Sequence, residues 1–237
     1  MSRDISCLKK IILSLCFMFA GASSLFALDK GSITLYPQAG FGISGAFASA
    51  ISGSYLNDIL YDDRDPILWE YKDAKTKPGF SLSAGMEVDH MLTDFLALTG
   101  GILLDYISFK VVYESPSNPD SGMKFKFLYA GIPVGLRLYR GIFMAGCGLY
   151  MSTPLFNRAS IRYGFYSSKE KLDNVEPTIG FFLDAGLNFS RSDTRNLMIF
   201  LRMKNDYLHS YYNIRGIIER TQNWSCHLIA AYGFRLD

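Results

Sequence analysis

The sequence predicts an all-β fold: an eight-stranded antiparallel up-and-down transmembrane β-barrel, preceded by a cleavable signal peptide. Three observations predict it. Apolar and polar residues alternate through eight segments of the chain. Seven of the segments are 10–16 residues long and the eighth, 197–204, has eight; a soluble strand typically has about 5–6, and a strand that crosses a bilayer at a tilt needs about 9–11. The first 27 residues have the composition of an export signal.

The length, charge and composition of the chain exclude several classes of protein. The chain has 237 residues, with 24 basic and 22 acidic side chains and 15% aromatic residues. Loss of residues 1–27 removes three basic residues and one acidic residue, so 21 of each remain and the formal charge is zero. A neutral chain lacks the basic surface that nucleic-acid binding needs, so we exclude that partner. The aromatic content excludes disorder, and no later apolar run reaches the roughly 18 residues of a spanning helix.

Residues 1–27 form the predicted signal peptide. Basic residues precede a short apolar stretch, 11–20, and small residues follow it. We expect cleavage after Ala27, with cleavage after Ser24 as the alternative and an uncleaved anchor as the competing interpretation. The remainder, 28–237, shows no internal repeat and no boundary, so we expect one barrel domain, exported to the bacterial outer membrane.

The eight alternating segments share one pattern, in which apolar side chains occupy one face and small or polar side chains the other. In the first segment, Phe41 and Ile43 alternate with Gly42 and Ser44. Such alternation is typical of strands with one face toward an apolar environment. The segments are 32–47, 79–91, 96–106, 128–138, 143–152, 179–189, 197–204 and 224–236.

The connections between these segments alternate in length. Those near residues 93, 140 and 192 are short, whereas the others are long and polar, namely 48–78, 114–123, 156–177 and 208–222. Short turns at one rim and long loops at the other are the arrangement of outer-membrane barrels.

A soluble, lipocalin-like barrel is the competing fold, because it also has eight strands. Its apolar face would point inward, and its outer face would carry charges along every strand. Here the polar face consists mainly of small residues, such as Gly40, Ser83, Gly146 and Gly186. Small residues suit a crowded interior better than a solvated exterior, so the membrane barrel is favoured.

Three stretches resemble a known family. The segment 127–134, FLYAGIPV, resembles the YLxIPxxL strand of the PorT-like outer-membrane β-barrel family, which is similar to the small OmpA- and OmpX-type barrels. The glycine-rich stretch 144–150 resembles the strand that follows it in that family, and 179–189 the next strand. Arg202 stands where such barrels often carry an inward arginine. The resemblance implies an eight-stranded outer-membrane barrel and implies no single activity.

Charged residues on the polar face form the predicted lumen charge cluster. Glu87, Asp105, Asp184 and Arg202 lie several residues from the short-turn rim and should meet near mid-barrel, with Arg202 as the main cation. Arg137 and Arg235, together with Asp89, lie closer to that rim. An eight-stranded barrel has an interior just wide enough for side chains, so buried charges there must pair. Two interpretations stay open: a static network that closes the lumen, and a gate in a narrow pore.

The loop 48–78 is the predicted contact with partners. It mixes acids with aromatic residues, which are frequent in recognition hot spots. Our candidate residues for surface recognition are Tyr61, Asp62, Asp63, Trp69 and Tyr71. The alternative is a loop that only covers the barrel mouth. The loop 156–177 carries the opposite charge, on Arg158, Arg162, Lys169 and Lys171, and is a candidate to pair with it.

No residue pattern indicates catalysis, a metal or a cofactor. His90, His209 and His227 lack the spacing of metal ligands, and no nucleophile stands near a base. Cys147 and Cys226, which remain after signal cleavage, fall on nonadjacent strands of the apolar face, so we expect no disulfide.

We therefore expect a monomeric barrel, not an enzyme, in contact with outer-membrane lipid. Its predicted role is structural or adhesin-like, with host or matrix surface molecules as partners of the loops. The alternative is a narrow channel for small or hydrophobic solutes.

Overall fold

The computed structural model describes residues 31–47, 74–113, 122–163, 166–172, 175–192, 195–207, 210–214 and 217–236. The predicted candidates in the loop before residue 74, Tyr61, Asp62, Asp63, Trp69 and Tyr71, lie outside these ranges. So do His209 and the predicted signal peptide. Within the described ranges, no helix is long and apolar enough to span a membrane.

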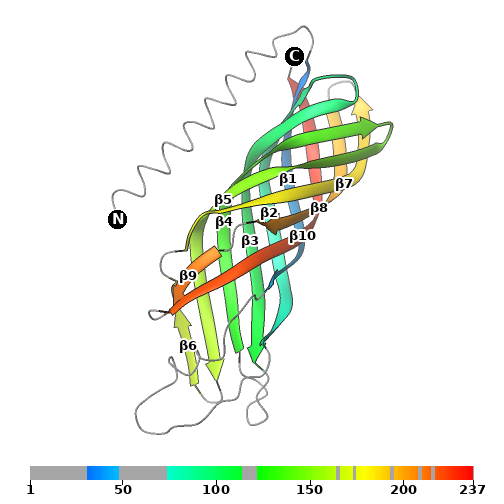
Figure 1. Ribbon diagram of the computed structural model, residues 1–237. Helices are drawn as coiled ribbons and strands as arrows, with labels where there is room; N and C mark the ends of the chain where they lie inside the picture. Colours follow the sequence, from blue (N-terminus) through cyan, green and yellow to red (C-terminus); the bar gives the residue numbers. More distant parts are fainter. Residues whose placement is uncertain are drawn as a thin grey trace, which may run out of the picture.

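Eight strands form a closed antiparallel barrel, which confirms the predicted fold (Figure 1). Each strand pairs with the next around the ring, and the last closes onto the first, with Ile33 opposite Leu236. Closure leaves no unpaired edge along the part of the ring where all eight strands pair. At the long-loop end, residues 74–78 of β2 and 153–158 of β5 extend beyond their neighbours β1 and β7. The ring strands are β1 (Ile33–Phe47), β2 (Ala74–Met91), β3 (Leu96–Tyr113), β4 (Gly122–Arg140), β5 (Phe143–Tyr163), β7 (Thr178–Ser192), β8 (Arg195–Asp206) and β10 (Ile217–Leu236).

Two short strands lie outside the ring. β6 (Tyr166–Glu170) pairs with the end of β5, and β9 (Ser210–Ile214) pairs with the start of β10. Both extend the wall at the end of the barrel that carries the long connections, opposite the end where β1 begins and β10 finishes (Figure 1).

The short turns lie where the sequence predicts them. Between β2 and β3, the Leu92 N–H donates to the Leu96 carbonyl at 2.8 Å, and the Thr93 hydroxyl accepts the Leu96 N–H at 3.1 Å. Between β4 and β5, only two residues separate the paired Arg140 and Phe143. The first of them, Gly141, has φ +59°, a left-handed conformation that glycine adopts without steric cost.

Strands at the long-loop end are longer than predicted. Residues 74–78, 122–127 and 156–163 are strand, whereas the sequence placed the first and last in loops and left much of the middle one unassigned. The alternation continues there, but the apolar side chains now point inward and the polar side chains outward. Phe109 and Phe125 point inward and are buried, whereas Lys110 and Lys124 lie on the outward positions. A search for apolar outward faces misses such strands.

The outside of the barrel carries an apolar belt that includes every ring strand. Its members are large apolar side chains that are exposed, and Ile102 and Leu149 are each 65% exposed. The apolar face thus points outward, and the lipocalin-like alternative, which requires it inside, is wrong. The belt comprises Phe41, Ile43, Phe80, Leu82, Met86, Ile102, Leu104, Leu136, Leu138, Phe143, Leu149, Ile179, Phe181, Leu183, Ile199, Leu201, Met203, Leu228 and Phe234.

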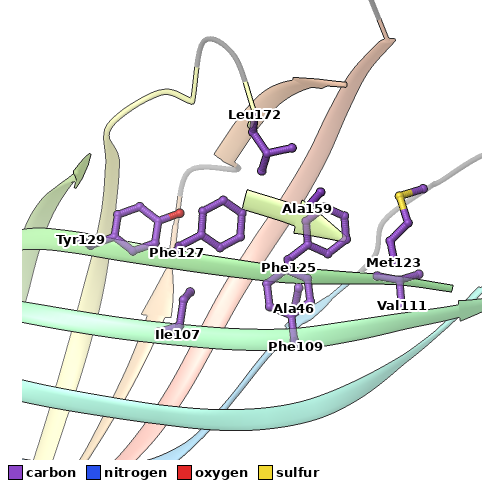
Figure 2. Packing of buried hydrophobic residues seen from close by; sticks show 10 residues of the cluster. All are labelled: Ala46, Ile107, Phe109, Val111, Met123, Phe125, Phe127, Tyr129, Ala159 and Leu172. Carbon is purple, nitrogen blue, oxygen red and sulfur yellow. The ribbon is translucent and has the colours of Figure 1, made fainter. Parts of the chain in front are cut away.

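The interior is filled in two different ways along the barrel. Toward the long-loop end lies an aromatic core made mostly by β3 and β4, where the Phe109 and Phe125 ring centroids are 5.1 Å apart (Figure 2). Leu172, from the segment after β6, is buried against it. Its members are Ala46, Ile107, Phe109, Val111, Met123, Phe125, Phe127, Tyr129, Ala159 and Leu172. The other half of the interior holds buried charges together with a second, smaller apolar cluster, made of Tyr36, Met144, Met198, Phe200, Ile229 and Ala231.

Candidate functional site

Five charged side chains meet inside the half of the barrel nearer the short turns. We call these residues the charge cluster: Glu87 and Asp89 from β2, Arg137 from β4, Asp184 from β7 and Arg202 from β8. Each is at most 4% exposed. They converge because all five occupy inward positions of the strand alternation.

Arg202 binds two carboxylates with all three of its guanidinium nitrogens. Its Nε donates to Asp184 Oδ1 at 2.7 Å and its Nη2 to Asp184 Oδ2 at 2.6 Å, a bidentate pair. Its Nη1 donates to Glu87 Oε1, and its Nη2 lies 3.2 Å from Glu87 Oε2. Asp184 faces Arg202 directly across the β7–β8 pairing, so the register itself presents the acceptor.

Arg137 joins the same carboxylates from the other side. Its Nη1 donates to Asp89 Oδ1 at 3.0 Å, and its Nη2 donates to Asp184 Oδ2 at 3.2 Å and to Glu87 Oε2. The Tyr139 hydroxyl donates to Asp89 Oδ2. Glu87 and Asp184 are therefore each shared by two guanidinium groups, which links β2, β4, β7 and β8 across the lumen.

Small and aromatic neighbours create the space that the two arginines occupy. A Cβ added at Gly146 would lie 3.0 Å from Arg137 Cγ and 3.1 Å from the Leu136 carbonyl oxygen, so a larger residue would crowd Arg137. The Arg202 guanidinium lies 4.7 Å from the centroid of the Phe182 ring and 5.3 Å from that of Phe200. These ring faces stabilise the cation in a site without solvent.

Asp105 lies apart from the charge cluster, and this differs from the prediction that it accepts from Arg202. Its Oδ2 accepts a hydrogen bond from Lys204 Nζ at 2.6 Å. Lys204 is two residues beyond Arg202 on β8 and is therefore one inward position nearer the long-loop end. The sequence places Lys204 on the polar face, but the predicted cluster did not include it. Only the register identifies it as the partner.

The remaining predicted lumen residue, Arg235, is exposed at the rim rather than among the buried charges. It stands one residue from the end of β10, where the barrel interior opens to the outside. Arg137, predicted nearer the rim, reaches the charge cluster because its long side chain extends to Glu87 and Asp184.

Two cavities lie on opposite sides of the charge cluster. One of about 340 Å³ opens at the short-turn rim and is lined by Thr34, Tyr36, Tyr139 and Arg235, among others. The second, of about 30 Å³, is lined by Asp105, Tyr150, Lys204 and Asp206, among others, and is large enough for only one or two waters. The two share no lining residue, and no member of the charge cluster lines either.

The described histidines and cysteines are His90, His227, Cys147 and Cys226. His227 is buried opposite Arg202, and neither ring nitrogen has a hydrogen-bond partner among the described residues. Cys147 and Cys226 are free thiols. Over the described part of the chain, no three His, Cys, Asp or Glu side chains are placed to hold a metal ion.

Among known proteins, the chain shows similarity only at the level of solved barrel structures. No protein-family model matches the chain, and no curated protein matches it. Among solved structures, it is similar to Ail, the attachment invasion locus protein of Yersinia pestis, in complex with a heparin analogue. The identity is 12%, the match covers 86% of this chain and 100% of Ail, and the TM-score is 0.43.

Two further solved structures give similar values. The outer membrane protein OprG from Pseudomonas aeruginosa is 8% identical, with 87% of this chain and 97% of OprG covered and a TM-score of 0.44. The outer membrane protein AlkL, solved in lipid bilayers, is 10% identical, with 87% of this chain and 92% of AlkL covered and a TM-score of 0.42.

Proposed function

We propose that the protein is an integral barrel of the bacterial outer membrane, exported by the signal peptide 1–27, with a closed lumen and a structural or surface-recognition role. The observation that carries this proposal is the combination of an apolar belt outside with paired charges inside. A soluble protein places these two classes of side chain the other way round.

The apolar belt supports the membrane location. Monomeric soluble proteins seldom expose contiguous apolar patches larger than a few hundred Å². Here the belt includes all eight ring strands, and side chains such as Leu149 and Phe143 are 65% exposed. Lipid chains cover such a surface without cost. The short turns at one rim and the long connections at the other are the arrangement of barrels in the outer membrane.

The filled interior supports a role other than transport. Eight strands enclose little more space than their own side chains occupy. Arg137 and Arg202 are fully buried across the lumen, and the aromatic core fills the end beyond them. A solute would have to break several charge-assisted hydrogen bonds and then displace packed rings.

Surface recognition then falls to the connections at the long-loop end. The segment that joins β1 to β2 contains the candidate residues Tyr61, Asp62, Asp63, Trp69 and Tyr71, whose side-chain types suit binding to host or matrix molecules. A variant without residues 58–73 keeps β2 intact, because β2 begins at Ala74. It should still fold and should lose binding to such surfaces. A scrambled 58–73 segment of equal composition is the matched control.

Membrane fractionation is the experiment that tests the location. We expect the mature protein in the outer-membrane fraction, resistant to carbonate extraction, with an electrophoretic mobility that changes on heating. Recovery in the soluble fraction would refute the proposal. Edman sequencing of the same material would locate the cleavage site, after Ala27 or after Ser24.

A narrow channel for small or hydrophobic solutes is the second candidate, and the cavity of about 340 Å³ at the short-turn rim favours it. The charge cluster, together with buried apolar side chains such as Met198 and Phe200, separates this vestibule from the smaller cavity beyond. Planar-bilayer recordings decide between the two functions. A channel predicts discrete conductance that rises in an Arg202→Ala variant, whereas a closed barrel predicts silence in the wild-type protein.

A further inference from the structure

A group of basic residues lies on the outside of the barrel at the long-loop end. We call it the basic face. It consists of outward positions on β2 to β6, namely Lys77, Lys110, Lys124, Lys126, Arg158 and Lys169. Lys77, Lys124, Arg158 and Lys169 are exposed, and the other two are half-buried.

Strand register places these cations next to one another. Lys77 faces Lys110 across β2 and β3, and Lys110 faces Lys124 across β3 and β4. In the same row, Lys124 faces Ser160, which faces Lys169. Neighbouring strands are about 4.8 Å apart, so this row is a closely spaced line of positive charge.

Within β2 to β5, the strands that carry most of the basic face, no carboxylate faces this line. The carboxylates of β2 and β3 are Glu87, Asp89 and Asp105, and all three are buried inside the barrel. The sequences of β4 and β5 contain no carboxylate. Like charges directly opposite each other destabilise a sheet. The arrangement therefore favours an anion from outside these four strands.

The basic face begins where the apolar surface ends. Leu82, Tyr106, Leu128 and Phe156 form one outward row across β2 to β5. Two residues further along the strands comes the pair Lys126 and Arg158, and two further again the line through Lys124. At about 3.3 Å per residue these steps are roughly 7 Å and 13 Å along the strand. The Arg158 guanidinium lies 5.5 Å from the Phe156 ring centroid, so the two surfaces are in contact.

We propose that the basic face binds the phosphate groups of lipid headgroups in the leaflet on the long-loop side. This inference rests on the proposed location in the outer membrane. When lipid chains pack against Leu128 and Phe156, their phosphates lie at the height of Lys126 and Arg158. A soluble polyanion gains nothing from cations at this particular height, so the position favours lipid. The face is also a strand surface continuous with the belt, not a separate pocket.

The test uses the full mature protein in detergent micelles, titrated with diphosphorylated lipid A and followed by native mass spectrometry. The variant K124Q/R158Q removes two exposed cations. Its matched control, R140Q/R235Q, removes two exposed cations at the opposite rim. Cations near an anionic membrane surface each contribute about fivefold in affinity, so we expect a loss on the order of 20-fold for the first variant and little change for the control.

Two further probes separate the sources of phosphate. Lipid A with both phosphates removed should bind the wild-type protein as weakly as diphosphorylated lipid A binds K124Q/R158Q. Heparin, a soluble polyanion, should compete poorly. Equal binding of the dephosphorylated lipid, equal losses in the two variants, or preference for heparin would each overturn the inference.

The acidic connection between β1 and β2 provides a final check. If it covers the basic face, lipid A should bind only after residues 58–73 are deleted, and that result would also overturn the inference. Heat-modifiable mobility confirms folding of each variant, and K77Q/K169Q replaces K124Q/R158Q if the latter does not fold. Fractionation of wild-type cells is independent, so failure of the membrane location and failure of lipid binding give different results.

Discussion

The two halves of the barrel interior are filled differently within one continuous wall. The half near the short turns holds the charge cluster, in which Arg137 and Arg202 share Glu87 and Asp184. The other half holds the aromatic core around Phe125. The buried charges of the first half are held by directed hydrogen bonds, whereas the second half is held by contact area. The first should therefore tolerate far less change in geometry than the second.

The largest effect is expected from Arg202→Ala. The substitution leaves Asp184 and Glu87 buried with one guanidinium between them, and loss of one partner of a buried ion pair costs about 3–5 kcal/mol. Urea unfolding of the refolded barrel in lipid vesicles measures this free energy. The double variant R202A/D184A should be less destabilised than the sum of the two single variants. An unchanged unfolding midpoint for Arg202→Ala would show that the charge cluster does not stabilise the barrel.

The matching change in the other half is Phe125→Ala. It leaves a cavity beside Phe109 and Phe127, whose ring centroids lie 5.1 Å and 6.3 Å from that of Phe125. Removal of a buried phenyl ring costs about 3 kcal/mol or more. The same unfolding assay applies, with the exposed Phe143→Ala as the control of equal chemistry. Equal stability of the two variants would mean that the aromatic core is not packed.

Lys204 lies between the charge cluster and the aromatic core. We expect a smaller loss of unfolding free energy from Lys204→Met. Asp105 loses its ammonium partner, but it lines the cavity of about 30 Å³, where one or two waters can hydrate it. We expect a cost of about 2 kcal/mol, below that of Arg202→Ala. The additional substitution Asp105→Asn removes the unpaired charge and should restore part of the stability. No recovery in the double variant would argue against the ion pair as the cause.

The smallest effect is expected from Phe125→Leu. This substitution is the most discriminating test of the difference between the aromatic core and the charge cluster. A smaller apolar side chain can repack in a core held by contact area, so we expect a cost below about 1.5 kcal/mol. Arg202→Lys conserves charge in the same way but loses the bidentate fork to Asp184, and it should cost more. If the lysine variant is the more stable of the two, the distinction between the two halves is wrong.

The barrel was predictable because membrane strands repeat one signal. Alternation in every ring strand, with Phe41 and Leu201 on apolar positions, predicts eight strands and an outward apolar face. The short turns at Thr93 and Gly141 follow from the same pattern. The strand ends near Lys124 and Arg158 were not predictable in this way, because beyond the apolar belt the outward residues become basic and the apolar residues turn inward.

The sequence predicts which charged side chains point into the lumen, but it does not predict which of them form ion pairs. Alternation alone places Glu87, Asp184 and Arg202 on the inner face. Which carboxylate meets which cation depends on the register between strands, and one sequence carries no direct signal for it. Asp105 shows the result: it meets Lys204 at 2.6 Å rather than Arg202, one inward position away.

The sequence separations between the paired residues of the charge cluster constrain the order in which the barrel strands assemble. Asp184 and Arg202 are 18 residues apart on paired neighbouring strands, so these two charges can pair as the β7–β8 hairpin forms. Glu87 and Arg202 are 115 residues apart and meet only when the sheet curves round. Contacts of such separation form slowly, because a long loop must close first. The β7–β8 hairpin can therefore pair Arg202 with Asp184 early, whereas its Lys204 has to wait for Asp105 of β3. Glu87, Asp89 and Arg137 on β2 and β4 together carry a net negative charge until the sheet closes.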